Sequence, residues 1–203
     1  MFRTKDPQKS LHFYRDLLGM TLLAESHHSD FSLYFLACAS QNPVLAGTHP
    51  LLFTVSCTVF VSNTYSLLSF IVMNLTAALA AGTLPSPSTP EAKEFMKCMF
   101  GPVIELTHNH GTESQPDFKY HNGNDQDQGQ LRGFGHLGFL VDDLDSACAY
   151  LESQGVSFKK KPLEGTMRGL AFAYDTPNDN YWVELIQRKG ISLVDQSKPI
   201  DTV

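Results

Sequence analysis

Acidic and basic side chains are missing from one long stretch of this 203-residue chain. Residues 31–90 contain no Asp, Glu, Lys or Arg, although the overall charged fraction of 18% would place about eleven there. Residues 51–81 are long enough to span a bilayer, but Ser, Thr and Asn interrupt the apolar run and no basic flank sets an orientation. We interpret residues 41–90 as an atypical insertion, and favour a translated intron over a genuine surface element or a membrane helix.

Basic residues and paired cysteines are also scarce. The chain has a net charge of -6 and a pI of 5.7, the opposite of the balance that a nucleic-acid surface needs. Its four cysteines show no Cys-x-x-Cys spacing, and a chain of this length can bury a core without disulfides. We expect a cytoplasmic protein with no nucleic-acid or membrane partner. An organellar location is the alternative if an upstream segment is missing.

Three apolar strings each carry one side chain that can ligate a metal. They are residues 103–109 with Glu105, residues 132–139 with His136, and residues 181–185 with Glu184. Their apolar neighbours predict strands that are covered on both faces. A lone strand glutamate or histidine usually has a structural role. Two carboxylates and an imidazole in the same setting favour a metal, because an unpaired buried carboxylate costs on the order of several kcal/mol.

Two segments of the chain repeat one pattern. Residues 6–20 and residues 142–156 both have an acidic start, apolar residues at helical spacing and a glycine near the end. Strand-like runs follow each helix, at residues 31–36 and 103–107 in the first half and at residues 169–174 and 181–186 in the second. Glu105 and Glu184 are therefore equivalent. His136 lies on a strand before the second helix, so symmetry requires a similar strand at the start of the chain.

Eight short strings match one known family in the same order. They lie at residues 5–14, 18–22, 31–37, 105–113, 120–124, 132–136, 169–172 and 181–184. In these strings the chain resembles glyoxalase I (lactoylglutathione lyase), a family of the vicinal-oxygen-chelate superfamily. The resemblance implies an α+β fold of two βαβββ repeats. The expected N-terminal half is residues 1–125 with the insertion, the C-terminal half is residues 126–188, and residues 189–203 are a polar tail.

The family's fourth metal ligand, a glutamine or similar residue, aligns two residues before Met1. We therefore expect the first strand of the N-terminal repeat to be missing and the metal to have three ligands from this chain.

The resemblance implies isomerisation of the methylglyoxal–glutathione hemithioacetal to S-lactoylglutathione. This chemistry removes a proton next to a carbonyl, so it needs a carboxylate base and an electrophile for the enediolate oxygens. By the match, Glu105, His136 and Glu184 hold a divalent metal, zinc in families of eukaryotic type, with nickel or cobalt as alternatives. Glu184 is the expected base, and Glu105 is expected to assist with the other stereoisomer.

Glutathione, the implied co-substrate, has two carboxylates that suit guanidinium and ammonium partners. The matching positions are Arg3, Asn109, Arg132 and Lys160. An apolar pocket around the methyl group and thiol matches Phe31, Leu33, Phe35, Met167, Leu170 and Phe172. Residues 162–169 correspond to a mobile flap with glycine hinges. The family also implies a homodimer with the site at the subunit interface.

Two alternatives stay open. A dioxygenase or thiol transferase would use the same scaffold, although extradiol dioxygenases use two histidines and one carboxylate instead of two glutamates and one histidine. Because one ligand lies outside this chain, an impaired paralogue that binds glutathione conjugates or only dimerises is the other alternative.

Overall fold

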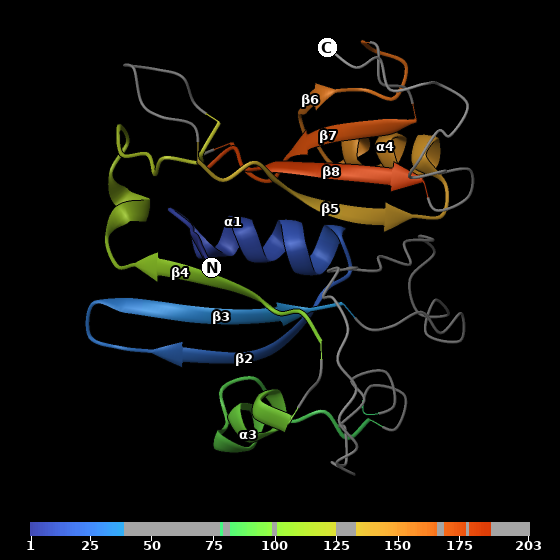
Figure 1. Cartoon of the computed structure of the whole chain (residues 1–203). Coiled ribbons are helices and arrows are strands. Elements are labelled where there is room, and N and C mark those ends of the chain that lie inside the picture. Colours follow the sequence, from blue (N-terminus) through green and yellow to red (C-terminus); the bar gives the residue numbers. More distant parts are fainter. Residues whose placement is uncertain are drawn as a thin grey trace, which may run out of the picture.

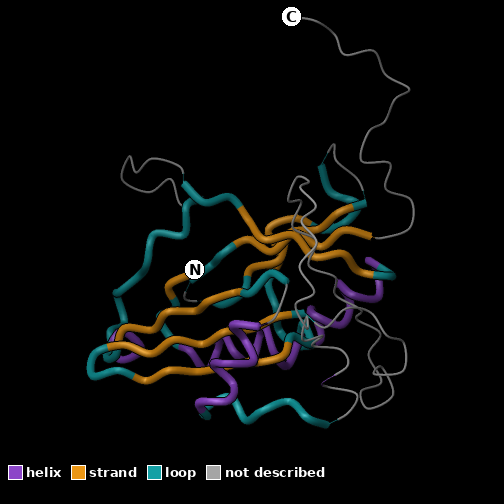
Figure 2. The backbone as a smooth tube through the Cα atoms, turned by 60° about the horizontal axis from the view of Figure 1, so that its bottom comes forward, coloured by secondary structure: helices purple, strands orange, loops and turns teal. Residues whose placement is uncertain are grey.

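Two four-stranded mixed sheets, each with its own helix, form the protein (Figure 1). The structure is a computed structural model and describes residues 1–38, 78, 82–98, 101–124, 133–165, 169–177 and 179–187. Most of the predicted insertion, Arg132, Met167 and the predicted polar tail lie outside the described residues. The strands of the two sheets also form separate groups in the turned view of Figure 2.

The N-terminal half contains sheet A, with strand order β1-β4-β3-β2. Its elements are β1 (Phe2–Arg3), α1 (Pro7–Leu11), the π-helix η1 (His12–Leu17), β2 (Thr21–His27), β3 (Phe31–Ala37), α3 (Pro90–Cys98), β4 (Ile104–Asn109) and the 3-10 helix η3 (Thr112–Ser114).

The C-terminal half contains sheet B, with the matching order β5-β8-β7-β6. Its elements are β5 (His136–Val141), α4 (Leu144–Ser153), β6 (Phe158–Lys160), β7 (Leu170–Tyr174) and β8 (Trp182–Gln187). In each half the first and last strands are parallel and the others are antiparallel. This arrangement confirms the predicted pair of βαβββ repeats.

The first strand of sheet A is present but only two residues long. Phe2 pairs with Leu106 in β4, just as Phe139 pairs with Leu185 in β8. The prediction that this strand is missing is therefore not confirmed. By this register the position equivalent to His136, three residues before Phe139, falls upstream of Met1.

The two helices of the repeat begin and end in similar ways. Asp6 caps α1 and Asp143 caps α4, each side chain accepting backbone N–H groups of the first turn. Gly19 and Gly155 follow the helices with φ of +71° and +81°, a left-handed conformation that glycine adopts without strain. The predicted start and stop signals are thus confirmed in both halves.

One hydrophobic core runs through both halves. Tyr14 from η1, Leu106 from β4, Phe139 from β5 and Leu185 from β8 belong to the same cluster and are almost fully buried. Removing this apolar surface from water stabilises the two halves as one unit, by about 25 cal/mol for each Å².

α3 covers the outer edge of sheet A beside β2 (Figure 1). Phe95 is buried in a small cluster with Leu23 and Ala37, and the Glu25 N–H donates to the Pro87 carbonyl at 2.9 Å. The segment that leads into α3, the end of the predicted insertion, therefore protects an edge strand from further pairing. Among the described residues, no helix is both long and apolar enough to cross a membrane.

Candidate metal and substrate site

The predicted ligands His136 and Glu184 meet on sheet B. His136 opens β5 and Glu184 lies in the middle of β8, its parallel neighbour. Their Nε2 and Oε2 atoms are 3.1 Å apart. Gly138 pairs with Glu184, and a Cβ atom there would lie 3.7 Å from Oε2, an ordinary contact distance, so this glycine adjoins the carboxylate.

This face of sheet B is open in the single chain, and we call it the open face. The His136 side chain is 42% exposed and that of Glu184 is 13% exposed. On the opposite face Phe139, Val183 and Leu185 are fully buried. The prediction that these strands are covered on both faces is wrong for the described chain, because only one face packs against the helix and core.

The predicted apolar contacts of sheet B lie beside this pair. Phe172 pairs with Glu184, and its ring centroid is 5.2 Å from that of His136 in an edge-to-face contact. Leu170 pairs with Ile186 on the same face. Lys160 lies near these residues, but its Nζ donates a hydrogen bond to the Leu170 carbonyl at 2.9 Å. Its ammonium group is therefore held at the backbone where β7 begins.

Glu105 occupies the corresponding face of sheet A. It pairs with Phe35 in β3, and the Thr107 hydroxyl donates to its Oε1 atom at 3.4 Å. The predicted apolar residues Phe31 and Leu33 share its half-buried face because they alternate with Phe35 along β3.

Glu105 does not join His136 and Glu184 within one chain. In the part of the chain that the structure describes, no group of three or more His, Cys, Asp or Glu side chains could hold one metal ion. The predicted site residues are therefore divided into two half-sites. The Glu105 half-site is the half-buried face of sheet A that carries Glu105, and the Glu184 half-site is the open face of sheet B.

The Glu105 half-site also contains a polar chain. An Arg3 guanidinium nitrogen donates to Asn109 Oδ1 at 3.3 Å, and Asn109 Nδ2 donates to the Tyr120 hydroxyl at 3.0 Å. Arg3 and Asn109 were predicted from the sequence to contact glutathione, and the structure brings them together. Tyr120 was not among the predicted site residues. The only sequence signal for it was its place in the 120–124 segment that matches the family.

A buried polar joint fixes the two half-sites relative to each other. The Asp179 carboxylate accepts from the Thr4 hydroxyl at 3.0 Å and from the Lys5 N–H at 3.1 Å, just after β1. The Tyr181 hydroxyl donates to the Arg3 carbonyl at 3.2 Å, just before β8. Sequence reasoning missed this joint, because Asp and Asn between two strands usually indicate an ordinary turn.

Burial shapes the protonation of this joint. The Asp175 carboxylate accepts from the Tyr14 hydroxyl at 3.2 Å and from the N–H groups of Thr176 and Tyr181. Even so, burial and the nearby Asp179 charge raise the pKa of Asp175 to about 8. Burial also raises the pKa of Asp179 and raises that of Tyr181 to about 12. One of the two acids therefore carries a proton near neutral pH.

Comparisons with known proteins show the family of the chain. The sequence model of the Glyoxalase/Bleomycin resistance protein/Dioxygenase superfamily matches residues 1–56 and 99–185. A lactoylglutathione lyase of Pseudomonas aeruginosa is 38% identical over 192 residues, which are 92% of this chain and 79% of that protein. One of Schizosaccharomyces pombe is 37% identical over 188 residues, which are 93% of this chain and 46% of that protein. The chain thus spans less than half of this relative, and 42% of a glyoxalase I of Saccharomyces cerevisiae.

A solved structure supports the fold. The trypanothione-dependent glyoxalase I of Leishmania major matches with a TM-score of 0.50 at 20% identity, over 93% of this chain and 84% of that one. The chain belongs to the lactoylglutathione lyase (glyoxalase I) family of carbon–sulfur lyases.

Proposed function

We propose that the chain isomerises the hemithioacetal of methylglyoxal and glutathione to S-lactoylglutathione, in the cytoplasm. The observation that carries this proposal is the 3.1 Å pair of His136 and Glu184 on the open face of sheet B, in a member of this family. A carboxylate with an open approach suits the removal of a proton next to a carbonyl.

Glu184 is the proposed base. Its carboxylate takes the proton from the carbon next to the carbonyl and returns it to the former carbonyl carbon. The hydroxyl proton of the first carbon passes to the former carbonyl oxygen, so the reaction is an isomerisation with no net gain or loss of atoms. Phe172, whose ring lies beside His136, keeps water away from one side of this pair.

The ligand atoms fit a divalent metal. Two ligands of one zinc ion with bonds of about 2.0–2.2 Å lie roughly 3 Å apart, and His136 Nε2 and Glu184 Oε2 are 3.1 Å apart. The half-exposed imidazole leaves positions for further ligands. When bound, a metal would polarise the substrate carbonyl and stabilise negative charge on its oxygen. Zinc is our choice, with nickel and cobalt as the alternatives.

A homodimer would complete the site. Glu105 lies on the other sheet and forms no three-ligand group with His136 and Glu184 in the described part of one chain. We propose that Glu105 of one subunit joins His136 and Glu184 of its partner. The length of the fungal relatives supports this, because each is more than twice as long as the segment that matches and has room for a second unit.

Mixing two inactive variants tests the composite site. Glu105→Gln and Glu184→Gln should each lose thioester formation, and an equal mixture refolded together should recover about a quarter of wild-type activity, since half of the dimers are mixed and each has one intact site. Sedimentation analysis checks that dimers form. No recovery from stable mixed dimers would mean that both glutamates act within one subunit.

The impaired paralogue is the second candidate, because only two ligands meet in the described part of one chain. It predicts that the protein binds S-methylglutathione and metal without turnover. Metal analysis, calorimetry and the ultraviolet assay of thioester formation on the wild-type protein separate the two candidates. Turnover above the uncatalysed rate eliminates the paralogue.

A further inference from the structure

Tyr120 ends the polar chain of the Glu105 half-site. Asn109 lies between two partners, with its Oδ1 atom 3.3 Å from Arg3 and its Nδ2 atom 3.0 Å from the Tyr120 hydroxyl. A guanidinium has only donors, so the amide must present its oxygen to Arg3 and its NH₂ group to Tyr120. The phenol oxygen therefore accepts, and the plane of the amide is held at both ends.

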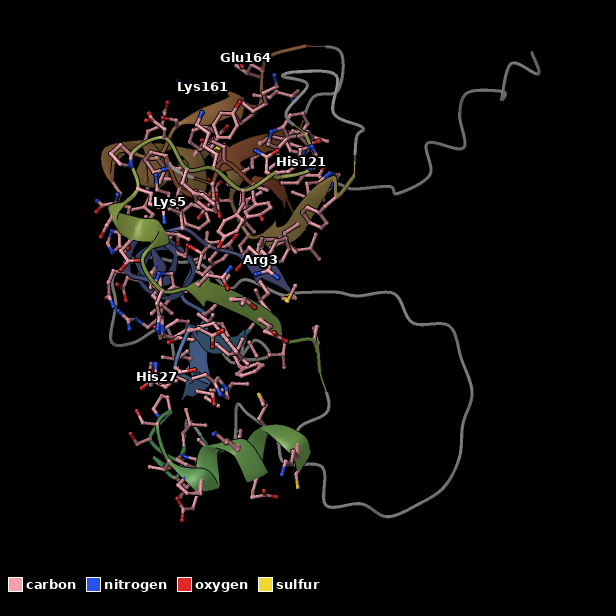
Figure 3. All side chains as sticks on the ribbon, turned by 90° about the vertical axis from the view of Figure 1, so that its left-hand side faces the viewer. Arg3, Lys5, His27, His121, Lys161 and Glu164 are labelled. Atoms are coloured by element: carbon pink, nitrogen blue, oxygen red, sulfur yellow. The ribbon has the colours of Figure 1, made fainter. Side chains whose placement is uncertain are left out.

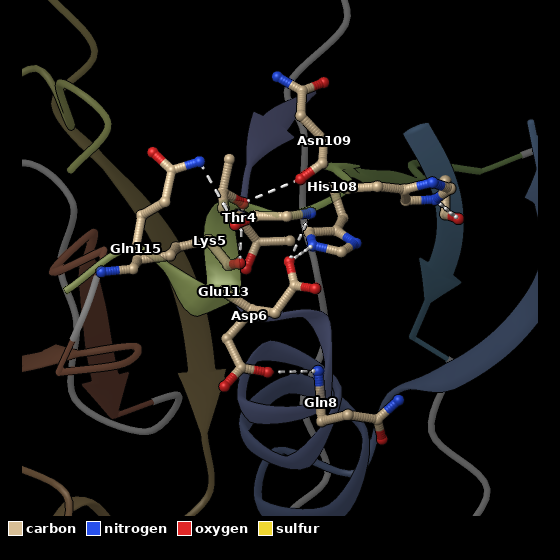
Figure 4. A network of polar contacts seen from close by, with 12 residues as sticks. Thr4, Lys5, Asp6, Gln8, His108, Asn109, Glu113 and Gln115 are labelled. Carbon is tan, nitrogen blue, oxygen red and sulfur yellow. Dashed lines mark hydrogen bonds and ion pairs between the residues drawn. The ribbon is translucent and has the colours of Figure 1, made fainter. Parts of the chain in front are cut away.

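The segment that carries Tyr120 is anchored on both sides. Before it, the Thr112 hydroxyl shares its proton between the carbonyl groups of Lys5 and Asn109, both at 3.0 Å. Figure 4 labels these two acceptor residues from close by. The Lys5 ammonium group also donates to the Pro116 carbonyl at 3.1 Å. After it, Asn122 Nδ2 donates to the Asp179 carbonyl at 3.1 Å, which ties the segment to the C-terminal half.

The ring of Tyr120 is fixed as well. It makes an edge-to-face contact with Phe118, with ring centroids 4.7 Å apart. Because the backbone and the ring of Tyr120 are both held in place, its hydroxyl has a fixed position. A neighbouring side chain can be oriented by a hydrogen bond to it. Asn109, in contrast, depends on hydrogen bonds for the orientation of its amide.

Arg3 lines a cavity that has room for one end of a ligand. A cavity of about 390 Å³ lies beside β1 and is lined by Arg3, Tyr120 and His121, together with aromatic side chains. Figure 3 shows Arg3 beside β1 and β4 of sheet A and His121 beside the strands of sheet B. Arg3 is exposed there, and its remaining N–H groups suit a carboxylate.

We propose that Tyr120 is a positioning residue, which orients Asn109 and through it holds the Arg3 guanidinium toward a carboxylate of the glutathione moiety. The inference rests on the proposed function, because glutathione is the ligand that brings this carboxylate. In this proposal Tyr120 acts through Asn109 and Arg3 and not on the reacting carbons. It therefore affects how tightly the substrate is bound and not how fast the bound substrate reacts.

The test removes one hydroxyl and changes the ligand in parallel. Tyr120→Phe should raise KM and the Kd of S-methylglutathione by about 3–10-fold, the loss of one hydrogen bond, with kcat within about twofold of wild type. S-methylglutathione esterified at the recognised carboxylate should bind wild type and variant equally. In an Arg3→Met background the effect of Tyr120→Phe should disappear. Ser153→Ala, which removes a hydroxyl and the hydrogen bond that it donates at the exposed end of α4, is the control.

Each outcome of this test bears either on the role of Tyr120 or on the proposed function. Equal losses for free and esterified ligands, or additive effects with Arg3→Met, would overturn the role of Tyr120. Turnover with an unchanged KM in Tyr120→Phe would overturn it as well and leave the proposed function standing. Binding of S-methylglutathione by a wild-type protein that shows no turnover would overturn the proposed function alone. A wild-type protein that does neither overturns both.

Discussion

Sheet B brings His136 and Glu184 together across a six-residue parallel pair, whereas sheet A has Glu105 beside Thr107 and a polar chain that starts at Arg3. The parallel strands β1 and β4 of sheet A pair in the same register as β5 and β8 of sheet B, so the duplicated fold offers equivalent positions in both halves. In the proposed function these positions have different tasks. Sheet B supplies the base and two metal ligands, and sheet A supplies one more ligand and the recognition of an anion.

The largest expected effect separates the two equivalent glutamates. Glu184→Gln should lower kcat/KM by about 10³-fold or more, because the base is lost together with a ligand. Glu105→Gln should also remove most of the activity, but by a smaller factor than Glu184→Gln, since it leaves the pair on sheet B intact. Steady-state thioester formation and bound metal per chain measure both effects. Glu94→Gln on the exposed side of α3 is the control, and a larger loss for Glu105→Gln would place the base on sheet A.

Sequence reasoning found the repeat because it depends on local signals. An acidic cap, helical spacing, a terminal glycine and alternating strands place Glu105 and Glu184 at equivalent positions without any knowledge of packing. Whether a strand face is covered depends on what packs there, and the apolar residues around His136 look the same either way. The contact of Asn109 with Tyr120, eleven positions further along the chain, is equally hard to predict, since no periodicity governs it.

The joint between the halves should give the largest effect on stability. Asp179→Ala removes the carboxylate that accepts from the Thr4 hydroxyl and the Lys5 N–H, and among the described residues only the hydroxyl keeps another partner, the Ser10 hydroxyl at 2.6 Å. The buried Lys5 N–H loses its acceptor, so the free energy of unfolding should fall by about 2 kcal/mol. Urea denaturation measures it. Asp117→Ala, at an exposed aspartate in the segment after η3, should change stability little. Similar losses in the two variants would show that the joint does not hold the halves together.

The same joint should make stability fall as pH rises. The folded protein keeps a proton on Asp175, whose pKa is raised to about 8, whereas the unfolded chain releases it near pH 4. Between about pH 5 and 8 the native state thus binds more protons, and the free energy of unfolding decreases by up to about 1.4 kcal/mol per pH unit. Asp175→Asn should flatten this slope, with the groups facing it, Tyr14, Asp179 and Tyr181, left in place.

Urea midpoints across this pH range compare wild type with Asp175→Asn. Asp145→Asn, on the exposed side of α4, should keep the wild-type slope. A wild-type midpoint that rises with pH would mean that the three hydrogen bonds to the Asp175 carboxylate outweigh its burial and that the buried acid is ionised.

The smallest effects compare the two helix caps. The Asp143 carboxylate accepts one short hydrogen bond, from the Ser146 N–H at 2.7 Å. One oxygen of Asp6 instead accepts two longer hydrogen bonds, from the N–H groups of Gln8 at 3.1 Å and Lys9 at 3.5 Å. Both Asp→Ala variants should lower Tm by a few degrees, and Asp143→Ala should lower it more.

The Ser146 hydrogen bonds lower the pKa of Asp143. The contribution of this cap to stability is therefore present above the pKa of an unfolded aspartate and is lost as acid protonates the carboxylate. Asp143→Asn keeps an acceptor oxygen and should retain most of the stability at neutral pH. A loss as large as that of Asp143→Ala would show that charge near the helix end, and not the capping bond, distinguishes the C-terminal half.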